Sequence, residues 1–372
     1  MRCVPDLFPQ PPAGRPLRVA PPGGHIAGHQ MTTIDTFDPD VPLFVRSGIN
    51  LASAGLGAKA ISATDEFFAP LERMLDDGPA IFYPDRFDDH GKWMDGWETR
   101  RRRGSGHDHA VIRLAAAGRL LGFDVDTSHF TGNFAPAVRI EACTCPQGEP
   151  GADQNWVEIL PNAPLGPSSH HYFPCKSYEL WTHLRIHIYP DGGIARLRAY
   201  GVPELDPSNH GQDEIDLAAA LNGGRVLAFS DAHYGDFRRL LSPGRGVTMA
   251  DGWETRRRRE PGYDWMVVAL GARGRIDRVV VDTHLFKGNF PDSCSFRAAD
   301  LSEFGDGLTD ALVTSSMFWE ELLPRQKLQG DTIHEFTDEV IDIGPVTHVR
   351  FNIHPDGGVS RLRLFGRPAW RG

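Results

Sequence analysis

A nine-residue motif, DGWETRRRR, sets a carboxylate beside a run of guanidinium groups, and it occurs twice, at 95–103 and 251–259. Alternate side chains of an extended segment share a face, so each copy is expected to present one glutamate and two arginines together. These residues are Glu98, Arg100 and Arg102 in the first copy and Glu254, Arg256 and Arg258 in the second. Guanidinium groups bind carboxylates through paired hydrogen bonds. The motif therefore predicts arginines that bind a small carboxylate and glutamates that act in catalysis, with purely structural ion pairing as the alternative.

A second pair of segments, DTSHFTGNF at 126–134 and DTHLFKGNF at 282–290, combines acidic, imidazole and amide groups with a Gly-Asn turn signal. Sites often lie where a strand ends in a loop. Histidine transfers protons near neutral pH, so His129 and His284 are predicted to be catalytic. The predicted substrate-binding residues are Asp126, Asn133, Asp282, Lys287 and Asn289. The alternative is that the aspartates and asparagines only shape the turn.

The segment His107-Asp108-His109 places two imidazoles on one face of a predicted strand. The second copy has Tyr263 and Trp265 at the matching positions, which are not metal ligands. We therefore expect no metal, and no other cofactor is indicated.

The two motifs belong to a tandem duplication that spans most of the chain. The order of the matched segments is the same in both copies, and a PDGG turn followed by RLR closes each one, at 190–198 and 355–363. The expected organisation is a Pro/Gly-rich disordered tail at 1–30, a first repeat at 31–203 and a second at 212–372. Two copies of this length indicate two similar domains rather than a solenoid.

Within each repeat the pattern is that of β-structure. Val138, Ile140 and Ala142 alternate with polar residues, as expected of a half-buried strand, and PDGG is typical of a tight turn. Thr64 and Ser230, followed by acidic residues, predict one helix near the start of each repeat. The expected fold class is all-β, with an antiparallel sandwich in each repeat.

Composition excludes several functional classes. The net charge is −10, which argues against nucleic-acid binding and against adhesion to anionic lipid. No apolar run approaches the length of a membrane span. Five cysteines without a CxxC pair, and no signal peptide, favour a cytoplasmic protein.

The doubled DGWETRRRR, the DT…GN loops and the PDGG…RLR turns together resemble the allantoicase (allantoate amidinohydrolase) family, over nearly the whole chain after about residue 45. The resemblance implies two jelly-roll β-sandwiches of the galactose-binding-like kind. It implies a hydrolase of C–N bonds in linear amidines that converts allantoate to ureidoglycolate and urea during purine breakdown. It also implies a homo-oligomeric, cytoplasmic enzyme whose partner is a small-molecule substrate.

Allantoate suits the candidate residues, because its carboxylate needs a cation, its departing urea needs an acid and the incoming water needs a base. A glutamate kept ionised by the neighbouring arginines suits the base, and His129 or His284 suits the acid. Water attack and prior loss of urea stay open, as does which repeat works. The rival hypotheses are a sugar-binding module with Trp97 or Trp253 stacked on a ring, and a duplication in which one repeat only supports the other.

Overall fold

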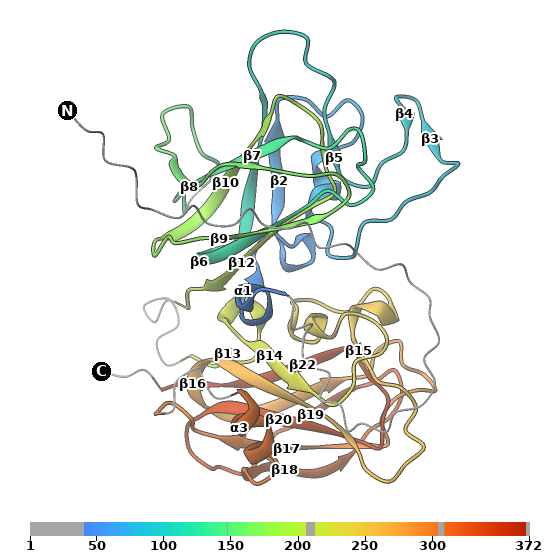
Figure 1. Ribbon diagram of the computed structural model, residues 1–372. Helices are drawn as coiled ribbons and strands as arrows, with labels where there is room; N and C mark the ends of the chain where they lie inside the picture. Colours follow the sequence, from blue (N-terminus) through green and yellow to red (C-terminus); the bar gives the residue numbers. More distant parts are fainter. Residues whose placement is uncertain (1–40, 147, 206–212, 304–308, 370–372) are drawn as a thin grey trace, which may run out of the picture.

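The computed structural model describes residues 41–146, 148–205, 213–303 and 309–369, which form two sheet-rich halves, one above the other in Figure 1. Each half contains its own eight-stranded antiparallel sheet. The expected class, all-β with two tandem β-sandwiches, is confirmed. The predicted tail at 1–30 lies outside the described residues.

The strands of the first half are short except for one that runs through both layers. They are β1 (Ile49–Asn50), β2 (Lys59–Ala63), β3 (Phe87–Asp88), β4 (Gly91–Lys92), β5 (Trp97–Glu98), β6 (Asp108–Asp126), β7 (Ala137–Cys143), β8 (Val157–Pro164), β9 (His170–Pro174), β10 (Leu180–Tyr189), β11 (Gly193–Ile194) and β12 (Arg196–Pro203).

The 19-residue strand β6 joins the two layers of the first sandwich. Its first part, 108–113, pairs with β10 and β2, and its last part, 118–126, pairs with β12 and, near the end, with β9. Beyond β10 the sheet continues through β7 to β8, and beyond β12 it ends at β1. Alternating apolar side chains such as Ile112, Phe123 and Val138 are fully buried between the layers, as the period of two predicts.

The second half repeats this arrangement around β16. Its strands are β13 (Ile215–Asp216), β14 (Arg225–Phe229), β15 (Trp253–Glu254), β16 (Asp264–Asp282), β17 (Ser293–Ala299), β18 (Glu320–Lys327), β19 (Ile333–Phe336), β20 (Val346–His354), β21 (Gly358–Val359) and β22 (Arg361–Pro368). The matching sheet order, β13-β22-β16-β20-β17-β18, shows that the duplication seen in the sequence is a duplication of the fold.

The helix predicted at the start of each repeat is wrong in its position. Thr64 and Ser230 do not cap helices, because their hydroxyls donate to Asp108 and Asp264 across the sheet, at 2.9 Å in both cases. Short 3₁₀ helices follow instead, η2 (Leu71–Leu75) and η4 (Phe237–Leu241). The remaining 3₁₀ helices are η1 (Ala54–Leu56), η3 (Ala220–Asn222) and η5 (Met249–Asp251), and the α-helices are α1 (Leu43–Ser47) and α3 (Thr309–Ser316).

The junction between the halves is packed. Helix α1 contacts β12 of the first half and β14 of the second, and it lies between the two sandwiches in Figure 1. Leu56 of the first half packs into the hydrophobic core of the second. No helix in the described part of the chain is long and apolar enough to cross a membrane.

Candidate active site

The Trp and Thr of the DGWET motif are structural in the first repeat. Trp97 is fully buried, and its indole N–H donates to the carbonyl of Asp65 at 2.9 Å. The backbone N–H of Thr99 donates to Gly192 at 3.1 Å. Trp253 is equally buried and donates to Asp231 at 2.8 Å. Neither indole is free to stack on a sugar ring, which removes the feature that favoured a sugar-binding module.

The arginines of the motif turn away from Glu98. Only Trp97 and Glu98 are in a strand, because side-chain carboxylates of Asp65 and Asp191 take the next N–H groups, those of Arg100 and Arg102. The alternation expected of an extended segment therefore ends after Glu98.

Each of these guanidiniums already has a carboxylate partner within the chain. Arg100 pairs with Asp65 at 2.7 Å and Arg102 pairs with Asp108. In the second repeat, Arg256 pairs with Asp231 at 2.8 Å and Arg258 with Asp264 at 2.5 Å. The same pairing in both copies matches the structural alternative.

A cavity of about 290 Å³ opens beside Glu98 in the first repeat. Its lining residues come from the DGWET motif, from the DT…GN loop and from the chain between η2 and β5. They are Phe68, Phe82, Lys92, Met94, Glu98, His129, Thr131 and Asn133. The structure thus brings together three predicted site residues, Glu98, His129 and Asn133, and does not place Arg100, Arg102 or Asp126 among the lining residues.

Glu98 is a buried carboxyl group without an arginine partner. Its side chain accepts a hydrogen bond from the Asn133 amide at 2.7 Å, and the residue is 8% exposed. Burial raises the pKa of Glu98 to about 7, against a smaller opposing effect of the Asn133 hydrogen bond, and the negative charge of Asp88 adds to the rise. The expectation that neighbouring arginines keep Glu98 ionised fails for this reason. A carboxyl group with a pKa near neutrality is suited to accept and return a proton.

His129 faces Glu98 across the cavity from the DT…GN loop. Its Nε2 lies 3.1 Å from the carbonyl oxygen of Ala80, which can only accept, so Nε2 carries a proton and donates. Its ring stacks on Phe82, with centroids 5.5 Å apart. The backbone at His129 has φ 69°, in the left-handed region, but Leu285 at the same place in the second repeat has φ 72°. This uncommon backbone conformation therefore belongs to the loop in both copies, and the imidazole is particular to the first.

Lys92 is the cation of the cavity, and the sequence interpretation missed it. Its ammonium donates to the carbonyl of Pro84 and lies 5.0 Å from the Phe82 ring centre. It belongs to a segment that has no counterpart in the second repeat, because the stretch from Asp65 to Asp95 is ten residues longer than that from Asp231 to Asp251. That difference in length was the available signal.

The predicted aspartates shape the loops. Asp126 is 1% exposed and accepts from the N–H of Ser128 at 2.8 Å, and Arg198 lies 3.8 Å from it. Asp282 accepts from the N–H of His284 at 2.9 Å and pairs with Arg245 at 3.0 Å. These contacts agree with the turn-shaping alternative.

The second repeat keeps only part of the arrangement. Glu254 and Asn289 are hydrogen-bonded like Glu98 and Asn133. Leu285 replaces the imidazole, and the covering segment with its lysine is missing. His284 pairs with Asp331 at 2.9 Å, and Lys287 is exposed. The two copies therefore differ in the residues that could transfer protons or bind an anion.

The paired histidines near the start of β6 lie in a separate network. His107 contacts His187 at 2.8 Å, and His187 contacts Glu141 at 2.9 Å. Glu141 also pairs with Arg139 and Arg185. Among the described residues no group of three His, Cys, Asp or Glu side chains is arranged to hold a metal ion.

Two β-sandwiches in tandem, with an acid–base cavity in the first, define the class of this protein as a duplicated β-sandwich with a hydrolase type of site. The comparisons with known proteins are specific. The family model described as "Allantoicase repeat" matches residues 49–204 and 215–369. The chain therefore belongs to the allantoicase family.

The relatives cover nearly the whole chain. "Probable allantoicase" from Rhizobium meliloti (strain 1021) is 60% identical over 334 residues, which is 88% of this chain and 96% of the relative. "Probable allantoicase 2" from Burkholderia pseudomallei (strain K96243) is 55% identical, over 89% of this chain and 98% of the relative. The crystal structure of allantoicase from Saccharomyces cerevisiae superposes with a TM-score of 0.73 at 36% identity, covering 87% of this chain and 94% of the yeast chain.

Proposed function

We propose that the cavity beside Glu98 is where this allantoicase hydrolyses allantoate to ureidoglycolate and urea. Enzymes of this family are hydrolases that act on C–N bonds in linear amidines. The observation that carries the proposal is a buried carboxyl group, with a pKa raised to about 7, that shares one cavity with an imidazole and an ammonium group. Each of the three needs of the reaction has a matching group there.

Glu98 is the base of the proposed reaction. In its ionised form it takes a proton from water, whose oxygen becomes the hydroxyl of ureidoglycolate. Asn133 holds the carboxylate by donating to one of its oxygens at 2.7 Å, which leaves the other oxygen for water. The departing urea nitrogen takes a proton from the imidazole of His129, whose orientation is set by Ala80 and Phe82. These roles hold whether water attacks directly or traps an imine.

Lys92 binds the carboxylate of allantoate in this proposal. Its charge is the only one of that sign among the residues that line the cavity, since the predicted arginines are paired elsewhere. Phe68, Phe82 and Met94 supply apolar walls that strengthen the attraction by excluding water.

We further propose that only the first repeat is catalytic. His129 and Lys92 have no equivalents in the second repeat, whereas Glu254 and Asn289 persist without them. The second repeat then serves as a support, one of the rival hypotheses drawn from the sequence.

The test is urea release by Glu98→Gln and Lys92→Met, with Glu254→Gln as the matched control in the second repeat. Glu98→Gln should lower kcat about 10²–10⁴-fold, the usual range for a lost general base. Lys92→Met removes a charge-assisted contact and should lower kcat/KM roughly 10- to 100-fold, mainly through KM. Allantoin, a ring without the free carboxylate, should yield no urea.

Glu254→Gln should keep the wild-type rate. Normal turnover by a folded Glu98→Gln protein would contradict the assignment of the site, and loss of activity in Glu254→Gln alone would place catalysis in the second repeat.

An oligomeric state, a cytoplasmic location and action without a cofactor are parts of the same proposal that rest on the family and on the composition. Sedimentation of the purified protein, and urea release after prolonged chelation, test the first and the last.

A further inference from the structure

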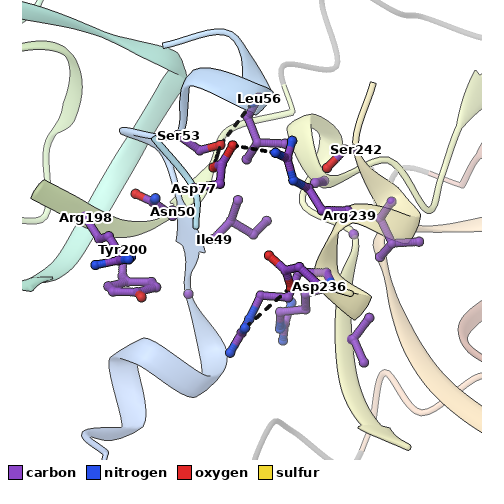
Figure 2. A pocket seen from close by; sticks show the side chains of 17 residues that line it. Ile49, Asn50, Ser53, Leu56, Asp77, Arg198, Tyr200, Asp236, Arg239 and Ser242 are labelled. Atoms are coloured by element: carbon purple, nitrogen blue, oxygen red, sulfur yellow. Dashed lines mark hydrogen bonds and ion pairs between the residues drawn. The ribbon is translucent and has the colours of Figure 1, made fainter. Parts of the chain in front are cut away.

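We propose that Arg239, in the second repeat, is a positioning residue for the active site of the first. Arg239 lies in η4 and reaches across the junction to Asp77, where the two side chains pair at 2.9 Å (Figure 2). Both line a cavity of about 120 Å³ between the repeats. This inference rests on the proposed function of the Glu98 cavity.

Asp77 is a well-defined anchor for this pair. The hydroxyl of Ser53 and the backbone N–H of Gly55 also donate to its carboxylate, the latter at 3.0 Å. The side chains of Asp77 and Arg239 are 14% and 22% exposed, so the pair is largely shielded from water. Gly55 leaves the room for it, because a Cβ there would overlap the guanidinium of Arg239.

The anchored residue begins the segment that covers the catalytic cavity. Three positions after Asp77, the carbonyl of Ala80 orients His129, and Phe82 then stacks on the imidazole. The other end of the segment is held within the first repeat, where Asp95 pairs with the buried Arg196 at 2.7 Å and accepts from the N–H of Ile81 at 2.8 Å. One end is thus fixed by the first repeat and the other by the second.

Asp251 in the second repeat explains why Arg239 can serve this purpose. By its place in the DGWET motif it corresponds to Asp95, yet Arg239 lies 3.6 Å from it and nearer to Asp77. Asp95 is paired inside its own repeat, whereas in the second repeat the arginine beside Asp251 extends to the neighbour. The second repeat thereby contributes to the reaction without holding a complete site.

Loss of the anchor should loosen the cover over Glu98 and admit water. The charged and titratable groups nearest to Glu98 are Lys92, His129 and Asp88, and the first two depend on the same segment. Hydration of Glu98 moves its pKa down toward that of an ordinary glutamate, because burial is the main cause of the rise. This consequence separates a positioning role from a role in stability alone.

The experiment compares Arg239→Met with Arg278→Met in the full chain. Arg278 is a matched control, since it pairs with Glu214 at 2.7 Å inside the second repeat, with its side chain 24% exposed. For Arg239→Met we expect kcat/KM to fall roughly tenfold, because small displacements of catalytic groups are costly. We also expect the acid limb of its pH profile to move below the wild-type position, and neither change for Arg278→Met.

Three further variants make the result decisive. Arg239→Lys should restore part of the rate, and Arg239→Met combined with Asp77→Asn should be no slower than the worse single variant. Gly55→Ala displaces the guanidinium without removing a charge, and it decides the matter if Arg239→Met melts early. Wild-type kcat/KM and pH profile in folded Arg239→Met or Gly55→Ala would overturn the inference. If Glu98→Gln is also active, the proposed site itself fails, so the two failures are distinguishable.

Discussion

Two opposing effects act on Glu98, and burial is the stronger. The Asn133 amide favours the carboxylate, while the loss of water around the side chain favours the neutral acid and raises the pKa to about 7. The folded protein therefore holds a proton that the unfolded chain releases at lower pH, and it loses stability as the pH rises through this range. Such a cost is expected where a residue is kept for chemistry rather than for folding.

The pH dependence of the reaction follows from this pKa. If ionised Glu98 is the base, kcat/KM should rise with increasing pH through about 7 and fall with a slope of one on the acid side. The measurement is a pH profile of urea release with saturating and limiting allantoate. The residual activity of Glu98→Gln should lack this limb, and Glu254→Gln should keep it. A wild-type rate that stays constant down to pH 5 would rule out Glu98 as the base.

At the scale of elements, the segment between η2 and β5 separates the two repeats in function. It forms the hairpin of β3 and β4, which projects from the upper half in Figure 1, and it brings Phe82 and Lys92 to the cavity. Residues 81–90 are all exposed, so the hairpin contributes little to the hydrophobic core. Its sequence is free to serve binding.

Removal of residues 82–91 should shorten this segment to the length found in the second repeat. We expect the protein to fold and to melt near the wild-type temperature, because the deleted residues lie outside the core clusters. We expect kcat/KM to fall at least as far as in Lys92→Met, since the stack on His129 is lost with Phe82. Circular dichroism and urea release check the two parts, and a shortened protein with full activity would show that the hairpin is dispensable.

At the scale of the molecule, the duplication gives two sandwiches that are joined as one packed body. Leu56 belongs to the first half but is buried in the core of the second, and the Arg239–Asp77 ion pair crosses the same junction (Figure 2). On the outer face of the second sandwich, α3 contributes Val313 to a small apolar cluster with Trp319. The two halves have thus diverged both at their surfaces and at the site.

Leu56→Ala tests the junction. Leu56 is 9% exposed, and deleting a buried leucine side chain should lower the free energy of unfolding by about 2–4 kcal/mol. Leu43→Ala, at a residue that is 69% exposed, should change it by less than about 0.5 kcal/mol. Denaturant unfolding measures both. Equal stability of the two variants would mean that the halves fold without support from this contact.

The sequence by itself determined the features that depend on local pattern and order. The repeated motifs established the duplication, and the alternation at Val138, Ile140 and Ala142 established a strand with one buried face. The motifs also identified Glu98, His129 and Asn133 as candidates, and these three share one cavity. Periodicity and repetition are properties of neighbouring residues, so they can be recognised without coordinates.

Only the tertiary structure decided which charges meet. Arg100 pairs with Asp65, which lies 35 positions earlier in the chain, and nothing local to the arginine run indicates that partner. Lys92 reaches the cavity through a hairpin that breaks the repeat, and Arg239 reaches Asp77 from the other half of the molecule. An ion pair depends on distance in space and on burial, and both are set by the way in which the layers fold over one another.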